Sequence, residues 1–138
     1  MNSRRYFLGA IAASTLAIAA GSAVAAPTTV EILAMPHPPV KMALAPLRTW
    51  LASQGGKLKV IETDIESPQG VKRLASVGLD GHIPILILID GQHRHKRKDG
   101  STIEFVNFPA IEGAPPGVRG KWITTDVQAV LIERMKMP

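Results

Sequence analysis

The sequence of 138 residues predicts an α/β domain in which helices cover both faces of a mixed sheet of four to five strands. Three observations favour this fold class. Strand-like and helix-like segments alternate in the first half, which requires a right-handed parallel crossover. The run Ile85–Ile89 is apolar at every position, as expected of a central strand covered on both sides. Tight-turn signals then separate further strands, so the second half returns through antiparallel pairing.

The first half supplies two strands and two helices. Val30–Met35 is a short apolar strand, and the prolines after it cannot continue a strand. Apolar residues follow at helical spacing over Val40–Leu51, and Pro46 is expected to kink this helix. Lys57–Ile65 reads as the second strand. Ser67 then caps a short second helix, which carries a proline in its first turn.

The second half adds strands, a connector and a closing helix. Gln92–Lys98 is polar throughout, and we expect it at an exposed position in a meander of three strands, with a disordered hairpin tip as the alternative. Ser101–Phe108 is a further strand. Pro109–Lys121 is rich in Pro and Gly and is either a ligand loop or a plain link. Thr125–Gln128 has the capping-box pattern and opens the last helix.

Composition excludes several classes of chemistry. The chain has no cysteine, which excludes disulfides, thiol nucleophiles, thiolate metal sites and dithiol redox catalysis. It has 16 Lys+Arg against 11 Asp+Glu, a formal net charge of +5 that is too mild to indicate nucleic-acid binding. Signature motifs of hydrolases, phosphate-binding loops and metalloproteases are missing. Asp64 and Glu66 could pair as acid and base, but neither a pocket nor a nucleophile partner is evident. We expect no enzyme, with an unrecognised hydrolase as the alternative.

Residues 1–25 read as an export signal. Arg4 and Arg5 precede an Ala-rich apolar run, and Ala23-Val24-Ala25 matches a cleavage site of small residues. The order Ser3–Leu8 resembles the twin-arginine signal, which implies export of a folded protein to the periplasm. An ordinary secretory signal and an uncleaved anchor are the alternatives. The remaining residues, 26–138, form one domain of ordinary size.

Two stretches of residues resemble the thioredoxin family. His37–Lys41 resembles the Cys-Pro-Pro-Cys turn of thioredoxin-like periplasmic proteins, with His37 and Val40 in place of the two cysteines. Gly81–Gly91 is similar to the stretch in which a proline opens the central strand of that family. The resemblance spans about residues 29–137 and implies a three-layer α/β/α sandwich. It also implies a cis peptide bond before Pro84.

This resemblance implies a scaffold that has lost its thiol chemistry and retains a docking groove. We therefore expect a redox-inactive module that binds an extended peptide or a periplasmic protein partner, in a chaperone-like role. A structural subunit that accompanies a partner is a further alternative. The expected groove comprises His37, Pro38, Pro39, Val40, Ile83 and Pro84.

A metal carrier is the competing hypothesis. Met35, His37 and Met42, together with His82, could gather at the same edge of the fold. Imidazole and thioether ligands suit copper, especially Cu(I). The more ordinary interpretation places Met42 in the core and leaves His37 solvated.

A second metal hypothesis concerns His93 and His95. If their segment is a strand, both rings lie on one face and could hold a divalent metal. The cations around them oppose metal binding and favour a solvated edge strand that resists aggregation. These cations also permit contact with an anionic surface or an acidic partner. They are Arg94, Lys96, Arg97 and Lys98.

Overall fold

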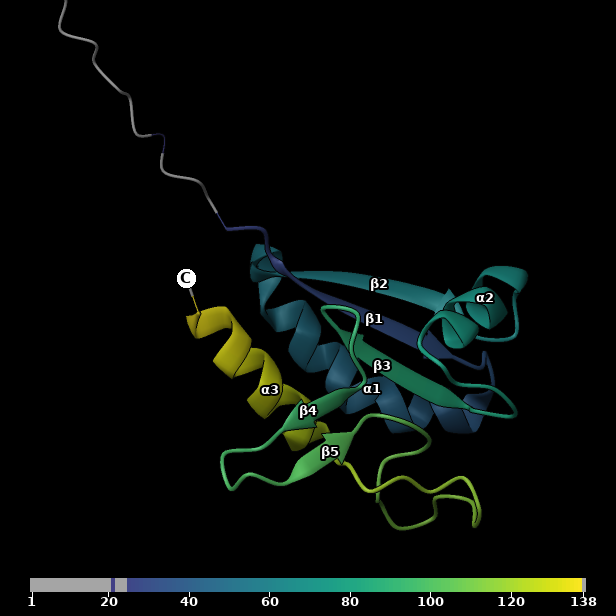
Figure 1. Ribbon diagram of the computed structural model, residues 1–138. Helices are drawn as coiled ribbons and strands as arrows, with labels where there is room; N and C mark the ends of the chain where they lie inside the picture. Colours follow the sequence, from purple (N-terminus) through teal and green to yellow (C-terminus); the bar gives the residue numbers. More distant parts are fainter. Residues whose placement is uncertain (1–20, 22–24, 138) are drawn as a thin grey trace, which may run out of the picture.

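The main sheet is built around β1 (Thr28–Ala34), in a computed structural model that describes residue 21 and residues 25–137 (Figure 1). β1 pairs in parallel with β2 (Leu58–Asp64) on one side. On the other side it pairs antiparallel with β3 (Ile85–Ile89). The sheet is therefore mixed, in the order β2-β1-β3.

The sequence pattern explains which strand lies where. All five residues of β3 are buried, which confirms the prediction of a strand covered on both faces. In β1, Val30 and Ile32 point to one face and are almost fully buried, whereas Glu31 points to the other face and is only half-buried. β2 is the edge strand, and its middle residues Val60 and Ile61 are both exposed.

The predicted strand Ser101–Phe108 is divided between two sheets. Its first part is β5 (Thr102–Glu104), which pairs antiparallel with β4 (Arg94–Lys96) in a separate two-stranded sheet. Its second part lies beside β3, where the Phe105 carbonyl accepts the Ile87 N–H at 3.0 Å. The expected single sheet of four to five strands is therefore replaced, in the described residues, by one sheet of three strands and one of two.

α1 (Pro38–Ser53) crosses from β1 to β2 and buries an apolar face against the sheet. The buried residues recur at helical spacing, as predicted, and they are Val40, Ala43, Leu44, Leu47 and Leu51. Pro46 lies inside the helix on its exposed side. A short 3₁₀ helix, η1 (Gly55–Lys57), follows and leads into β2; its first residue, Gly55, has a positive φ of 59°.

α2 (Pro68–Ser76) lies near the end of β2 (Figure 1). Its cap is as predicted, because the Ser67 hydroxyl accepts the Gly70 N–H at 3.0 Å. The Arg73 guanidinium donates two hydrogen bonds, of 2.9 and 2.6 Å, to the Glu31 carboxylate of β1. Because Glu31 points away from the face that holds Ile32, this paired contact fixes α2 to the opposite face of the sheet.

The closing helix α3 (Thr124–Lys136) begins earlier than predicted. The expected cap at Thr125 is wrong, because Ile123 is the N-cap and the Asp126 carboxylate accepts its N–H at 2.9 Å. Trp122 explains the shift: its indole is fully buried and its N–H reaches the carbonyls of Val106 and Asn107, both at 3.2 Å. With Trp122 anchored, the chain enters the helix directly after it.

The predicted export signal, residues 1–25, lies outside the described residues except at Gly21 and Ala25. Among the residues that the structure does describe, no helix combines the length and the apolar character needed to span a bilayer.

We predict that Gly70→Ala destabilises the protein, because α2 packs on the turn after β2 through this glycine. A Cβ at Gly70 would come within 2.2 Å of the Asp64 carbonyl oxygen and 2.6 Å of the Ile65 Cα. These are backbone atoms, so helix and turn must separate, at a cost of about 1–3 kcal/mol. Thermal unfolding followed by circular dichroism should show a Tm lower by several degrees.

Gly56→Ala is the matched control, since a Cβ there meets nothing within 4 Å and its φ is not positive. An equal decrease in Tm in both variants would show that the close approach of α2 to the turn does not cause the destabilisation by Gly70→Ala.

Candidate functional site

Three chain segments meet where β1 ends. The Met35 N–H donates to the Pro84 carbonyl at 2.9 Å, and the Ile65 N–H donates to the Ala34 carbonyl at 3.2 Å. The end of β1, the turn after β2 and the entry to β3 therefore lie at one edge of the sheet. We call this edge the strand-end site and define it by Met35, His37, Glu66 and residues 81–84.

His37 occupies the N-cap of α1, with extended backbone (φ −96°, ψ 147°) and no side-chain cap bond. Its ring is 56% exposed, and Nε2 lies 3.6 Å from a Glu66 carboxylate oxygen that is itself in a half-exposed side chain. An exposed pair of this kind contributes little to stability, and only when the imidazole is protonated. His37 is therefore free to turn toward a ligand.

The N-terminus of α1 is a poor anion site. The first two helical residues are Pro38 and Pro39, which have no N–H to donate. Lys41 already donates its N–H to the His37 carbonyl at 3.0 Å. Only the Val40 N–H is left in the first turn as a donor for a ligand.

The segment Gly81–Ile83 presents its backbone to solvent. Within the described part of the chain, its N–H and C=O groups form no hydrogen bond with other backbone groups. Gly81 has a φ of +83°, which a glycine adopts without strain. Gly81 and His82 are exposed and Ile83 is half-buried. An extended chain could pair with these free groups, as strands do at a sheet edge.

The expected cis bond before Pro84 is not found, because no peptide bond among the described residues is cis. The trans form is the intrinsically favoured isomer of an X-Pro bond. With the trans bond, Pro84 is buried and its carbonyl still accepts the Met35 N–H. His37 and Pro84 therefore lie at the same edge without the cis geometry.

A cavity of about 250 Å³ adjoins the strand-end site. Its apolar walls come from the end of β1, the turn after β2, one face of α2 and the entry to β3, and Glu66, Asp80 and His82 add polar groups. The apolar lining residues are Met35, Ile65, Val71, Leu74, Ala75, Leu79 and Ile83. A site of this size and lining can hold one apolar side chain of a bound segment.

The two carboxylates considered as an acid–base pair, Asp64 and Glu66, lie in the turn beside this site. Asp64 accepts the Glu66 N–H at 2.9 Å and so stabilises the turn after β2. Glu66 faces His37 across 3.6 Å. Both carboxylates are exposed, and the neighbouring Ser67 hydroxyl donates to the Asp64 backbone carbonyl at 2.6 Å rather than to a carboxylate.

The methionines of the proposed copper site are not gathered. Met35 is 7% exposed, whereas Met42 is 76% exposed, which corrects the expectation that Met42 packs in the core. Met42 comes five residues after His37, which places it about 140° away around the helix axis. The copper hypothesis therefore stays a prediction from sequence that the geometry does not strengthen.

His95 is buried, contrary to the expectation of an exposed segment. It is 6% exposed, stacks on Phe105 with the ring centroids 5.4 Å apart, and holds Nε2 at 2.9 Å from the Gln92 carbonyl. β4 alternates exposed-buried-exposed, which turns this ring inward and leaves one nitrogen for any further ligand. His93, the other histidine of this hypothesis, is half-buried. In the part of the chain that is described, no group of three His, Cys, Asp or Glu side chains could hold a metal ion.

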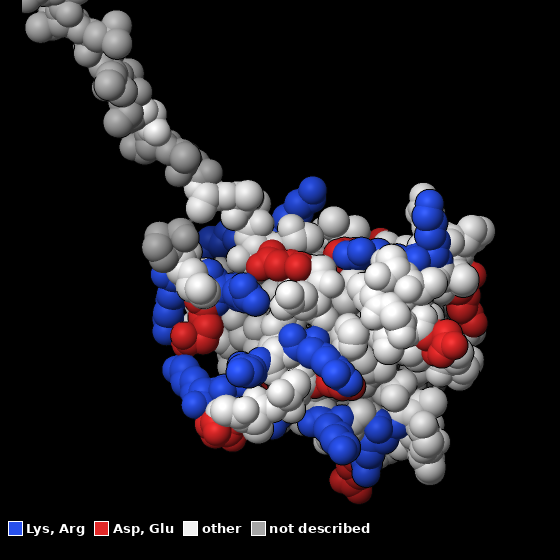
Figure 2. Space-filling view, viewed as in Figure 1, with Lys and Arg blue, Asp and Glu red and all other residues white. Residues whose placement is uncertain are grey.

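The basic residues of the hairpin are exposed as predicted, but three of the four have acidic partners, and two of these partners lie far away in sequence. Arg94 pairs with Glu104 at 2.5 Å across the hairpin. Arg97 and Lys98 reach α3, at Asp126 (3.1 Å) and Glu133 (3.2 Å). Figure 2 shows basic and acidic side chains interleaved on the side of the molecule where β4, β5 and α3 lie.

Reasoning from sequence missed the contribution of α3 to this region and that of Leu79 and Asp80 to the strand-end cavity. The last helix does carry a signal, since Arg134 and Lys136 repeat the basic character of the hairpin. No local pattern links the two segments. Comparison with protein-family models, with curated proteins and with solved structures finds no match for this chain.

We predict that His95 makes stability depend on pH. Burial is the main cause that lowers the pKa of His95 below its ordinary value of about 6.5. The unfolded chain therefore takes up a proton more readily than the folded one, and stability falls as pH drops through about 6.5 toward the lowered folded pKa. Between pH 8 and pH 5 the Tm of the wild type should fall more than that of His95→Gln.

The exposed His82 provides the control for this measurement, and His82→Gln should retain the pH dependence of the wild type. An equal decrease in Tm between pH 8 and pH 5 in His95→Gln and the wild type would contradict this account of His95.

Proposed function

We propose that this protein is a redox-inactive binding module that docks an extended segment of a partner protein at the strand-end site. The observation that carries the proposal is the free backbone of Gly81–Ile83 beside an apolar cavity, held in place by the bond from Met35 N–H to the Pro84 carbonyl. Backbone pairing would supply affinity, and the cavity would select the side chain.

The proposed ancestry is a thioredoxin-like three-layer sandwich without its cysteines. The order of elements supports it: a parallel β1–α1–β2 unit, then an antiparallel β3 beside β1, then Phe105–Asn107 beside β3, then α3. Helices attached to both faces of the sheet also support it. So does the position of His37 and Val40 at the start of α1, next to the proline that opens β3.

We further propose that the domain acts in the periplasm after export. The support is in the sequence, where Arg4-Arg5, an Ala-rich run and Ala23-Val24-Ala25 occur in the order of a twin-arginine signal.

Thiol chemistry cannot contribute, because the chain has no cysteine. Disulfide exchange needs an attacking thiolate and a second thiol to resolve the mixed disulfide. We predict that the purified protein does not accelerate the reduction of insulin by dithiothreitol, measured as turbidity. Reproducible acceleration above the rate without protein would refute the redox-inactive assignment.

Binding is tested with a panel of fluorescein-labelled peptides of eight residues that differ only at one central position. Leu or Met at this position should bind, because each can bury its side chain in the cavity. Gly and Asp should bind weakly. The measurement is fluorescence anisotropy of the labelled peptide as protein is added.

In Ala75→Phe, the new side chain fills the cavity from α2 and should weaken binding of the leucine peptide. Loss of one buried leucine side chain corresponds to about 1.5–3 kcal/mol, or about a 10- to 100-fold loss of affinity. Ala45→Phe is the matched control, since Ala45 is also an exposed helical alanine but lies outside the cavity. Equal affinities for the Leu and Asp peptides, or equal effects of the two variants, would reject the proposed docking site.

A further inference from the structure

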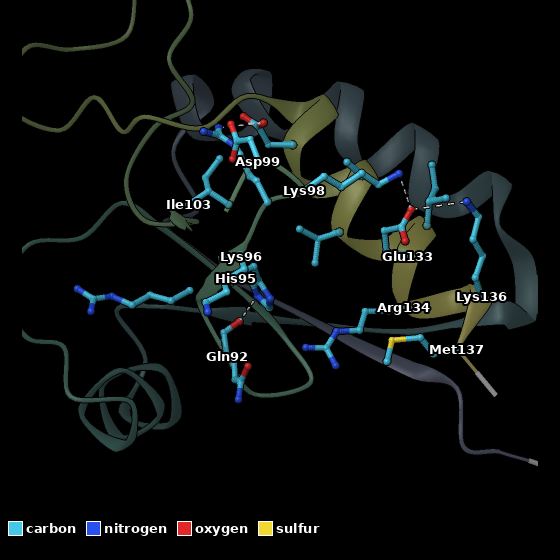
Figure 3. A pocket seen from close by; sticks show the side chains of 16 residues that line it. Gln92, His95, Lys96, Lys98, Asp99, Ile103, Glu133, Arg134, Lys136 and Met137 are labelled. Atoms are coloured by element: carbon cyan, nitrogen blue, oxygen red, sulfur yellow. Dashed lines mark hydrogen bonds and ion pairs between the residues drawn. The ribbon is translucent and has the colours of Figure 1, made fainter. Parts of the chain in front are cut away.

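A larger hollow lies between the β4–β5 hairpin and α3, with a volume of about 870 Å³ (Figure 3). It shares no residue with the strand-end site. One wall comes from Gln92, the run Arg94–Asp99 and Ile103, and the other comes from residues of α3 and the following Met137. We call this hollow the hairpin cleft.

The hairpin cleft combines apolar side chains with a basic rim. On α3, Asp126, Val130 and Glu133 recur at spacings of four and three residues, so they share one face of the helix, and Met137 directly follows the helix. Val130 and Ile132 of α3, with the buried Ile103 of the hairpin, supply aliphatic surface. Six cations against three carboxylates line the cleft, and the cations are Arg94, Lys96, Arg97, Lys98, Arg134 and Lys136.

Two of these cations differ from the rest. Glu133 bridges Lys98 and Lys136 at 3.2 and 3.6 Å, so these two lysines share one carboxylate. In contrast, Lys96 and Arg134 have no carboxylate within 4.0 Å among the described residues. Figure 3 shows Arg134 reaching from α3 toward Gln92 and His95.

Arg134 and the buried His95 line the same cleft. Burial is the main cause that lowers the pKa of the His95 imidazole, and the positive charge of Arg134 acts in the same direction. Lys96 and Arg134 therefore offer positive charge beside apolar surface, with no acid of this chain to neutralise it in the described residues.

We propose that the hairpin cleft binds an acidic segment of a partner protein, in which apolar side chains alternate with carboxylates. Charge complementarity selects carboxylates for Lys96 and Arg134, and the aliphatic side chains of the cleft select apolar side chains between them. A small anion would leave most of 870 Å³ unfilled. The basic residues surround a hollow of this size, which fits a chain segment better than a flat lipid surface.

The N-terminal segment of this chain is unsuited to the cleft by charge. Residues 1–24 contain Arg4 and Arg5 but no Asp or Glu. The occupant is therefore a different chain. Nucleic acid is disfavoured as well, because no Phe, Tyr or Trp lines the cleft on which a base could stack.

The test uses a fluorescein-labelled peptide of twelve residues in which Glu alternates with Leu, and anisotropy as the readout. We expect binding to the full-length protein in 50 mM salt, and at least tenfold weaker binding in 500 mM salt, because salt screens the charges. Lys96→Glu with Arg134→Glu should also weaken binding at least tenfold. The same peptide with Lys in place of Glu should not bind.

Lys59→Glu with Lys121→Glu is the matched control. It makes the same change in net charge at two exposed lysines outside the cleft, neither of which is in an ion pair within the described residues. This variant should lose less than half of the affinity. Equal losses in the two double variants would overturn the proposal, because they would show an effect of net charge alone.

Two further arms distinguish binding in the hairpin cleft from binding at the strand-end site and from binding to lipid. Ala75→Phe, which fills the strand-end cavity, should leave the acidic peptide unaffected, so failure of either site is recognised separately. Vesicles of phosphatidylglycerol should not displace the acidic peptide. Displacement by these vesicles, with no specific loss in Lys96→Glu/Arg134→Glu, would assign the basic rim to a lipid surface and overturn the proposal.

Discussion

The pairing of β1 with strands on both sides determines the rest of the structure. At its start, the Asp90 carboxylate accepts the Thr29 N–H at 3.0 Å and the Asp90 N–H donates to the Thr29 carbonyl at 2.9 Å. At its end, the Met35 N–H reaches the Pro84 carbonyl. Both ends of the β1–β3 pair are therefore closed, and a shift by one residue would expose Val30 and Ile32. The strand-end site inherits its geometry from this fixed register.

The two proposed surfaces use different physics and lie on different elements. The strand-end site offers free backbone groups and a small apolar cavity, so it should recognise an extended conformation and one side chain. The hairpin cleft offers positive charge beside aliphatic side chains, so it should recognise composition and respond to salt. One partner chain could engage both, which would raise its overall affinity through effective concentration.

Local patterns in the sequence predicted most elements and part of the site. The unbroken apolar run of β3, the helical spacing in α1 and the Ser67 cap all act within a few residues, so they can be read without the fold. Reasoning from sequence also placed His37 and Pro84 in one groove, and the structure brings the segments that carry them together at one edge.

Contacts between distant segments account for the rest. Trp122 starts α3 early through the carbonyls of Val106 and Asn107, which no capping pattern reveals. His95 is buried because its ring stacks on Phe105. The polar run in which His95 lies does not indicate this distant partner. Lys98 pairs with Glu133 across the cleft, and this contact too joins two segments that lie far apart in sequence. A single sequence records side-chain chemistry but not which distant surfaces face each other.

Hydrogen exchange at Gly81–Ile83 tests the central claim most directly, because these amides have no backbone partner in the described structure. The measurement compares the protein alone with the protein saturated by an extended peptide that carries a central leucine. The account predicts fast exchange of these amides in the free protein and slowed exchange on binding. Slow exchange in the free protein, or unchanged exchange here while the peptide is bound, would contradict it.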